Sequence, residues 1–246
     1  MTARTGAIGM PRRHFRIVDS TNERARELAA AGAPGGTIVT ASEQTAGRGR
    51  RGRQWTAPAG KAVLCSAVLS PLDAGHALLP LAAPLAICEA VESLAPLRCQ
   101  VKWPNDVWID ARKLAGVLIE AHPPDWAVIG IGLNVSIEPS EFPGDLRQPA
   151  TSVDHGVGTE EALDAVCERL GEWVRTEPER VLTEFRERDA LREREIGWVG
   201  AGGESGSGVA DGIDDRGNLV VVSSEGERLS LGSGEVSLTV PGQRDD

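Results

Sequence analysis

The chain of 246 residues contains very few lysines. Arginines number 23, and the only lysines are Lys61, Lys102 and Lys113. Since arginine supplies the generic surface cation here, a lysine inside a motif indicates a compact ammonium group in a confined site. Acidic residues outnumber basic ones by 36 to 26, which gives a net charge of −10. This balance argues against general binding of nucleic acid.

Cysteine and histidine are also scarce. The four cysteines, at positions 65, 88, 99 and 167, form no C-x-x-C pair, and the four histidines are scattered. These spacings argue against a zinc site. They favour a reduced, cytoplasmic protein in which cysteines act as small hydrophobic residues.

Long hydrophobic runs are missing. The longest apolar run, 77–88, is 12 residues long and contains Pro80 and Pro84, so we expect no membrane span. The first 15 residues lack the apolar stretch of a signal peptide. With 41% hydrophobic and 25% charged residues, the composition is that of an ordinary globular protein with a substantial core.

Charge is unevenly distributed along the chain. Residues 11–55 contain nine arginines and four acidic residues, whereas residues 195–246 contain three arginines and ten acidic residues. A positive segment on an acidic protein suggests either a site for a specific small anion or a solvated basic loop. Charge alone does not choose between these two interpretations.

The order of apolar and turn segments predicts an α+β fold with a mixed, mainly antiparallel sheet and helices packed on it. Strands joined by short links favour antiparallel pairing. We expect strands at 15–18, 37–42, 61–69, 98–103, 107–109, 114–121 and 126–131. We expect helices from the Ser20 cap to Gly32, then at about 84–95, 160–175 with a Thr159 cap, and 178–192.

Four segments follow from this organisation. They are a tail at 1–13, a main domain at 14–194, a small β domain at 195–240 and a tail at 241–246. Residues 197–240 contain 11 glycines and short Val/Leu runs that alternate with turns, which predicts a small β-barrel-like domain. A flexible linker is the alternative, and the alternating strands disfavour it.

The strongest motif, at 47–55, reads G-R-G-R-R-G-R-Q-W. Glycines allow a ligand to approach the backbone, arginines match carboxylate and phosphate oxygens, and Trp55 offers a flat face for stacking. The combination suits an anionic ligand with a ring, such as a nucleotide. A disordered RNA-binding segment rich in Arg and Gly is the alternative.

A second motif, at 102–106, reads K-W-P-N-D. Asn105 and Asp106 follow a strand, where they could reach a ligand, and Asp106 could help to hold Mg²⁺ beside phosphate oxygens. A plain Pro-Asn-Asp turn is the alternative interpretation.

Two further motifs follow within thirty residues of it. Residues 113–120 read K-L-A-G-V-L-I-E, and residues 130–135 read G-I-G-L-N-V. Lys113 begins an apolar strand close to Asp106, although an ordinary surface lysine would fit the same position. A lone G-x-G is weak evidence for a ligand on its own.

Taken in order, the four motifs resemble those of biotin protein ligase (biotin–[acetyl-CoA carboxylase] ligase). Ser20-Thr21-Asn22 and Gln44 fit the same pattern, and residues 234–237 fit the family's small SH3-like C-terminal domain. The resemblance implies a two-step reaction. ATP and biotin form biotinyl-5′-AMP and pyrophosphate, and a lysine of a biotin carboxyl carrier protein then receives the biotinyl group.

The resemblance also implies roles for particular residues. It assigns catalytic roles to Arg48, Arg50, Lys113 and Lys102, with Asp106 as a ligand of Mg²⁺. Residues expected around biotin and its activated carboxyl group are Ser20, Thr21, Asn22, Gln44, Arg48, Gly49, Arg50 and Lys113. Those expected near the nucleotide are Trp55, Asn105, Asp106 and Asn134. Other predicted binding residues are Gly47, Arg51, Arg53, Gly116 and Gly132.

Two departures from the family pattern narrow these expectations. About 13 residues precede the expected core, so we expect neither a DNA-binding domain nor binding to DNA or membranes. Thr239 stands where the family often has arginine.

Two competing interpretations of the function remain. They are a lipoate or octanoate ligase, and a non-catalytic module that binds biotin or nucleic acid. We expect a monomer or a homodimer.

Overall fold

The computed structural model describes residues 7–146, 148–200, 203–232 and 234–238. A seven-stranded mixed sheet forms its main part, with strand order β1-β2-β3-β7-β6-β5-β4. β1 and β2 are parallel, and all other neighbours are antiparallel. The strands are β1 (Arg12–Val18), β2 (Ile38–Gln44), β3 (Ala62–Leu69), β4 (Gln100–Lys102), β5 (Asp106–Ile109), β6 (Arg112–His122) and β7 (Trp126–Asn134).

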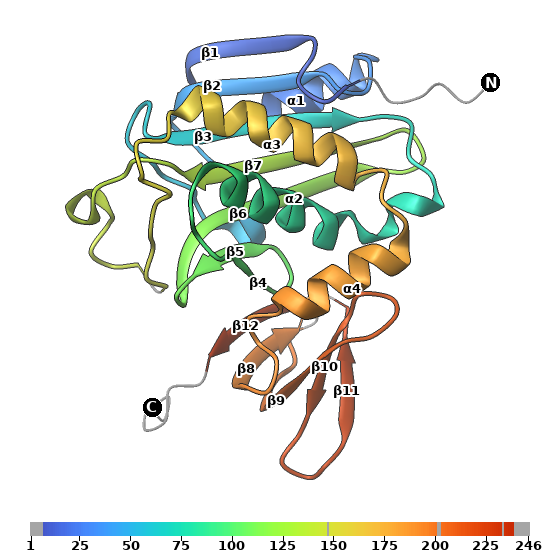
Figure 1. Cartoon of the computed structure of the whole chain (residues 1–246). Coiled ribbons are helices and arrows are strands. Elements are labelled where there is room, and N and C mark those ends of the chain that lie inside the picture. Colours follow the sequence, from blue (N-terminus) through green and yellow to red (C-terminus); the bar gives the residue numbers. More distant parts are fainter. Residues whose placement is uncertain (1–6, 147, 201–202, 233, 239–246) are drawn as a thin grey trace.

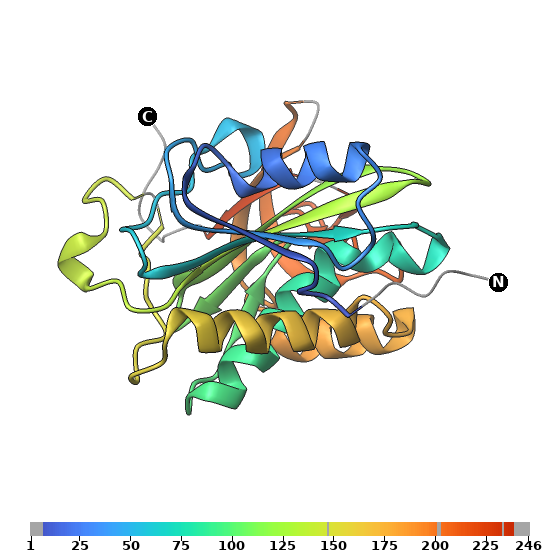
Figure 2. The same cartoon turned by 90° about the horizontal axis from the view of Figure 1, so that it is seen from above.

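Helices cover both faces of this sheet. Figure 2 shows α1 (Thr21–Ala30) on one face and α2 (Leu79–Leu94) and α3 (Thr159–Trp173) on the other. Because side chains alternate along a strand, Val39 packs against α1 while its neighbour Ile38 packs into the larger core with α2. The central strands are therefore buried on both faces, which explains their nearly continuous apolar sequences.

The apolar segment before residue 95 forms a longer helix than the sequence predicts. α2 begins at Leu79, with Pro80 in its first turn and Pro84 inside the helix, so the predicted start at Pro84 is wrong. The continuous helical stretch Ala74–Leu94 is long and apolar enough by composition to cross a membrane, but 67% of its most apolar window is buried inside the protein. The helix therefore forms part of the core.

Other element boundaries differ by a few residues from the predicted ones. β1 begins at Arg12, and β7 continues to Asn134. Ser20 occupies the N-cap of α1 without forming the side-chain cap hydrogen bond, and α3 is capped at Gly158 in place of Thr159. The two strands are longer than predicted because β1 pairs with β2, and β7 pairs with β3 and β6, beyond the residues that local propensity marks as strand.

A second, smaller sheet follows α4 (Pro178–Arg188). It contains β8 (Glu195–Gly200), β9 (Ser205–Ile213), β10 (Leu219–Val222), β11 (Arg228–Leu231) and β12 (Gly234–Leu238). All its pairings are antiparallel, in the order β11-β10-β9-β8-β12. The predicted small β domain is confirmed as a sheet, but among the described residues the ladder ends at β11 and β12, so no closed barrel forms. Thr239 lies outside the described residues.

Hydrogen bonds join the small sheet to the main domain. The Trp103 indole Nε1–H donates to the carbonyl of Gly217 at 3.0 Å, and Arg186 pairs with Asp215 at 2.9 Å. The segment between α4 and β8 is held to β4, because the backbone N–H of Ala190 donates to the carbonyl of Val101 at 3.0 Å. In Figure 1 the small sheet accordingly lies below α4 and beside β4. The K-W-P-N-D segment thus lies at the junction of the two parts.

Because α2 lies in the core, shortening one of its buried side chains should cause a large loss of stability. Leu85 is fully buried, so Leu85→Ala should lower the free energy of unfolding by about 2–5 kcal/mol through lost contacts and a cavity. The exposed Leu146 is the matched control, and Leu146→Ala should change it by no more than about 0.5 kcal/mol. Urea denaturation followed by circular dichroism measures both, and equal losses would contradict the proposed core.

Candidate functional site

One cavity brings together motifs that are far apart in the sequence. Its wall comes from the start of α1, the loop 45–60, the turn between β4 and β5, the middle of β6 and β7, and β12. The predicted site residues in this wall are Ser20, Thr21, Asn22, Gln44, Arg48, Gly49, Arg50, Arg51, Arg53, Trp55, Lys102, Asn105, Asp106, Lys113, Gly116 and Gly132.

Glycines of β6 and β7 form the floor beneath Trp55. Gly116 and Gly132 are direct partners across the two strands. A Cβ atom added at Gly132 would lie 2.3 Å from Cε2 of Trp55, and one at Gly116 would lie 3.2 Å from its Cζ3. At Gly130, a Cβ would lie 1.8 Å from Oδ1 of Asn22. The G-x-G motif therefore provides close approach for two side chains on one face of the sheet.

The loop that carries Trp55 is folded back on itself. Arg48 and Gln54 form an antiparallel bridge, and the N–H of Gly49 donates to the carbonyl of Arg53 at 2.7 Å. Arg51, at the tip, has a φ of 54°, in the left-handed region. We call residues 47–55 the arginine loop. Its internal hydrogen bonds and its packing on the sheet distinguish it from a disordered RNA-binding segment.

Two arginines of this loop link it to neighbouring parts. Arg50 donates to Oδ1 of Asn105 at 3.0 Å, and the amide of Asn105 donates in turn to the carbonyl of Val117 at 2.8 Å. Burial lowers the pKa of Arg50, while the nearby charge of Asp106 opposes that shift. Arg51 donates to the carbonyl of Gly200 at 2.7 Å, so the loop tip contacts the small sheet.

Both motif lysines lie beside Asp106. Nζ of Lys113 lies 2.8 Å from Oδ1 of Asp106 and 5.5 Å from the ring centroid of Trp55. Nζ of Lys102 lies 5.2 Å from the ring centroid of Trp108, and burial lowers the pKa of its amine, with the charge of Asp106 opposing. Asp106 is the only acidic residue in the described part of the cavity wall, against several cations. Such a wall favours an anionic ligand.

Neutral polar groups line the cavity near the start of α1. Oε1 of Gln44 accepts hydrogen bonds from the backbone N–H and the hydroxyl of Thr21, at 2.7 and 3.1 Å. Oγ of Ser66 lies 2.8 Å from Oγ1 of Thr21 and 2.6 Å from Oδ1 of Asn22. The cavity thus has a cationic part and a neutral hydrogen-bonding part.

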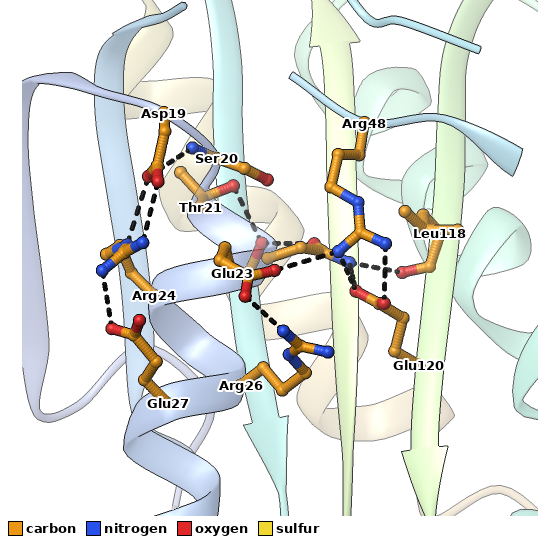
Figure 3. A network of polar contacts seen from close by, with 12 residues as sticks. Asp19, Ser20, Thr21, Glu23, Arg24, Arg26, Glu27, Arg48, Leu118 and Glu120 are labelled. Carbon is orange, nitrogen blue, oxygen red and sulfur yellow. Dashed lines mark hydrogen bonds and ion pairs between the residues drawn. The ribbon is translucent and has the colours of Figure 1, made fainter. Parts of the chain in front are cut away.

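Glu23, Glu120 and Ser66 organise this site, although they are not among the predicted site residues. Figure 3 shows Arg48 between the carboxylates of Glu23 and Glu120, at 3.1 and 3.2 Å. Ser66 is fully buried and faces α1. The signals that could have indicated them are a glutamate ending the K-L-A-G-V-L-I-E motif and a serine inside the apolar strand β3.

Two predicted site residues do not line the cavity. The amide of Asn134 donates to the carbonyl of Thr151 at 3.0 Å, so it holds the end of β7 to the 151–153 segment. At Gly47, an added Cβ would lie 2.3 Å from the carbonyl oxygen of Trp55, so this glycine allows the loop to close on itself. Conversely, Gly234 and Val236 of the small sheet do contribute to the wall.

Two protein-family models match this chain. Residues 14–134 match the model described as "Biotin/lipoate A/B protein ligase family", and residues 199–239 match "Biotin protein ligase C terminal domain". The first match covers the arginine loop and both lysine motifs. The second match covers most of the small sheet.

Individual relatives agree with these models. The chain is 32% identical over 242 residues to the biotin–[acetyl-CoA-carboxylase] ligase of Mycobacterium tuberculosis, which covers 91% of this chain and 88% of the relative. It is 37% identical over 162 residues to the bifunctional ligase/repressor BirA of Bacillus subtilis, spanning 63% of this chain and about half, 50%, of that relative's length.

A solved structure agrees as well. The biotin protein ligase of Aquifex aeolicus, in complex with biotin and ATP, aligns with a TM-score of 0.81 at 27% identity, covering 94% of this chain and all, 100%, of that one. The fold and the cavity thus define an α+β protein of the biotin/lipoate ligase class. Within that class, the chain belongs to the biotin protein ligase family.

The environment of Lys102 predicts an unusual titration. Because burial disfavours its charged form, its amine should lose its proton at a lower pH than an ordinary lysine. The unfolded state then binds more protons over that range, so this group makes the protein more stable as pH rises. Three lysines simplify assignment, and NMR of isotope-labelled lysine side chains, with Lys102→Arg for assignment, follows each amine. A Lys102 pKa at or above the ordinary value would contradict this prediction.

Proposed function

We propose that this chain activates biotin with ATP to give biotinyl-5′-AMP and pyrophosphate. A lysine amine of a biotin carboxyl carrier protein then attacks the acyl carbon, takes the biotinyl group and releases AMP. One observation carries the proposal. Cations surround a single carboxylate at one part of the cavity, beside the neutral polar group at the start of α1. Such a site suits a carboxylic acid bound beside a polyphosphate. Membership of the biotin protein ligase family indicates that this acid is biotin.

The first step needs charge neutralisation. A carboxylate oxygen of biotin attacks the α-phosphorus of ATP, the bond from that phosphorus to the bridging oxygen breaks, and pyrophosphate leaves with the electron pair. Both reactants are anions, so cations must offset their repulsion before and during the attack. Lys113, Arg50 and Lys102 are the candidates, because each lies in the cavity wall within the group around Asp106 and Asn105.

The neutral polar group suits the other end of the acid. Thr21 and Gln44 offer hydrogen-bonding groups from the start of α1 and the end of β2. A ring that carries amide-like N–H and C=O groups is held by such neutral partners and not by charge. Trp55 and the glycine floor would shield the activated acid from water, since the acyl-adenylate reacts with it.

Mg²⁺ would enter this site together with the phosphates of ATP. Among the described residues no cluster of three or more His, Cys, Asp or Glu side chains could hold a metal by itself. Mg²⁺ commonly takes one or two carboxylates plus phosphate oxygens, and Asp106 offers the carboxylate. When bound, the ion would offset phosphate charge.

The carrier protein, the cytoplasmic location and the monomeric or dimeric state remain predictions.

Lys113 provides the first test of this proposal. Lys113→Ala should reduce biotin-dependent pyrophosphate release by about a hundredfold, because it removes a cation beside the reacting anions. Lys61 is the matched control, since it pairs with Glu141 at an exposed site, and Lys61→Ala should leave the rate unchanged. Near-wild-type activity of Lys113→Ala, with the fold intact by circular dichroism, would refute its role.

The choice of acid provides the second test. Pyrophosphate release should be much faster with biotin than with lipoate or octanoate at equal concentration, because neutral hydrogen-bonding partners line the proposed ring site. Transfer of labelled biotin to a carrier domain with ATP and Mg²⁺ tests the second step. Faster turnover with lipoate would overturn the biotin assignment, and binding without any pyrophosphate release would indicate a non-catalytic module.

A further inference from the structure

Glu120 contacts two residues of the cavity wall, Asn22 and Arg48. Its carboxylate accepts a hydrogen bond from the Asn22 amide at 3.0 Å and pairs with the Arg48 guanidinium at 3.2 Å. Glu120 itself is not part of the cavity wall as described. It therefore joins three separate elements, namely α1, the arginine loop and β6, as Figure 3 shows. Any effect on a ligand would pass through the residues that it holds.

Asn22 is oriented from several sides. Its Nδ2 donates to Glu120 and lies 3.4 Å from the carbonyl of Leu118, while its Oδ1 lies 2.6 Å from the hydroxyl of Ser66. The side chain is 4% exposed and lies over Gly130. Because an amide can rotate to exchange its donor and acceptor ends, these partners decide which end faces which way. Glu120 supplies the charged acceptor in this set.

Arg48 is held by charge on both sides. Its guanidinium lies 3.1 Å from Glu23 and 3.2 Å from Glu120, so two carboxylates already offset its charge. It is thus less suited to neutralising a substrate anion than Lys113, which faces a single carboxylate. Arg48 also forms the base of the arginine loop through its bridge to Gln54.

We propose that Glu120 is a positioning residue: it fixes the Asn22 amide and, through Arg48, attaches the base of the arginine loop to the sheet. Arg48 accordingly acts through this ion pair and not directly on the reacting anions. The consequence for biotin rests on the proposed function. The consequence for the loop does not, because it concerns only contacts within the ligand-free protein.

Limited trypsin digestion of the ligand-free protein tests the attachment of the loop. The loop contains four arginines, so Glu120→Ala should raise the rate of cleavage within residues 48–54 several-fold. Glu27 is the matched control on α1, because it forms an exposed ion pair with Arg24 away from the cavity. Glu27→Ala should leave the rate unchanged. Unchanged loop cleavage in Glu120→Ala would overturn the proposed attachment.

Biotin binding by calorimetry tests the effect on the site. Glu120→Ala should weaken binding by about tenfold, in the range expected when a charged hydrogen-bond acceptor is removed. Glu120→Gln should recover part of that loss, since its carbonyl oxygen still accepts from Asn22. The double variant Arg48→Ala/Glu120→Ala should lose clearly less affinity than the sum of the two single losses, because the two residues act as a unit.

The results distinguish a failure of the positioning role of Glu120 from a failure of the proposed ligase function. Additive effects of Arg48→Ala and Glu120→Ala would show that Arg48 acts independently of Glu120, and would overturn the proposed unit. Equal binding by Glu120→Ala and wild type would overturn the positioning of Asn22. If wild-type protein bound no biotin while Glu120→Ala still accelerated loop cleavage, the proposed function would fail and the attachment of the loop would stand.

Discussion

The contact of Trp55 with two paired glycines is the constraint on which the site depends. Gly116 and Gly132 are direct cross-strand partners, and a Cβ at Gly132 would lie only 2.3 Å from the indole. Without that space the arginine loop could not lie against the sheet. Its position brings Arg50 to Asn105 and Trp55 to Lys113, so residues separated by more than fifty positions share one cavity wall.

The electrostatics of the chain follow from this arrangement. The protein as a whole carries a net charge of −10, yet the described wall of the cavity contains one acidic residue, Asp106, among several arginines and lysines. An acidic surface repels long polyanions, whereas a local group of cations attracts a small anion that fits the cavity. The few lysines are concentrated at the same place. Lys102 and Lys113 lie in the cavity wall with Asp106, and Lys61 does not.

Much of the fold and of the site could be predicted from the sequence, because periodicity and motif composition are local properties. The antiparallel strands and the small β domain were expected, and most predicted site residues line one cavity. The start of α2 was not, because the sequence suggested Pro84 for the first turn, where a proline is tolerated, whereas the helix has Pro80 in that turn and Pro84 inside it. The strand order in the described part of the small sheet depends on long-range pairing, which local patterns do not record.

Residues that organise the site were harder to predict than those that line it. Glu120 and Ser66 act on other side chains across the sheet, and their roles appear only when α1 and the loop are placed above β3 and β6. Asn134 shows the converse, because a motif residue holds a neighbouring segment and does not line the cavity. Motifs therefore predict which segments meet, while side-chain orientation decides which residue contacts the ligand.

A crystal structure of the protein incubated with biotin, ATP and Mg²⁺ would test whether this cavity holds the acyl-adenylate. We expect density for biotinyl-5′-AMP in the cavity, with its phosphoryl group beside Lys113 and Arg50 and its biotinyl ring near Thr21 and Gln44. Density for the adenylate elsewhere, or an acid bound away from the glycine floor, would contradict it.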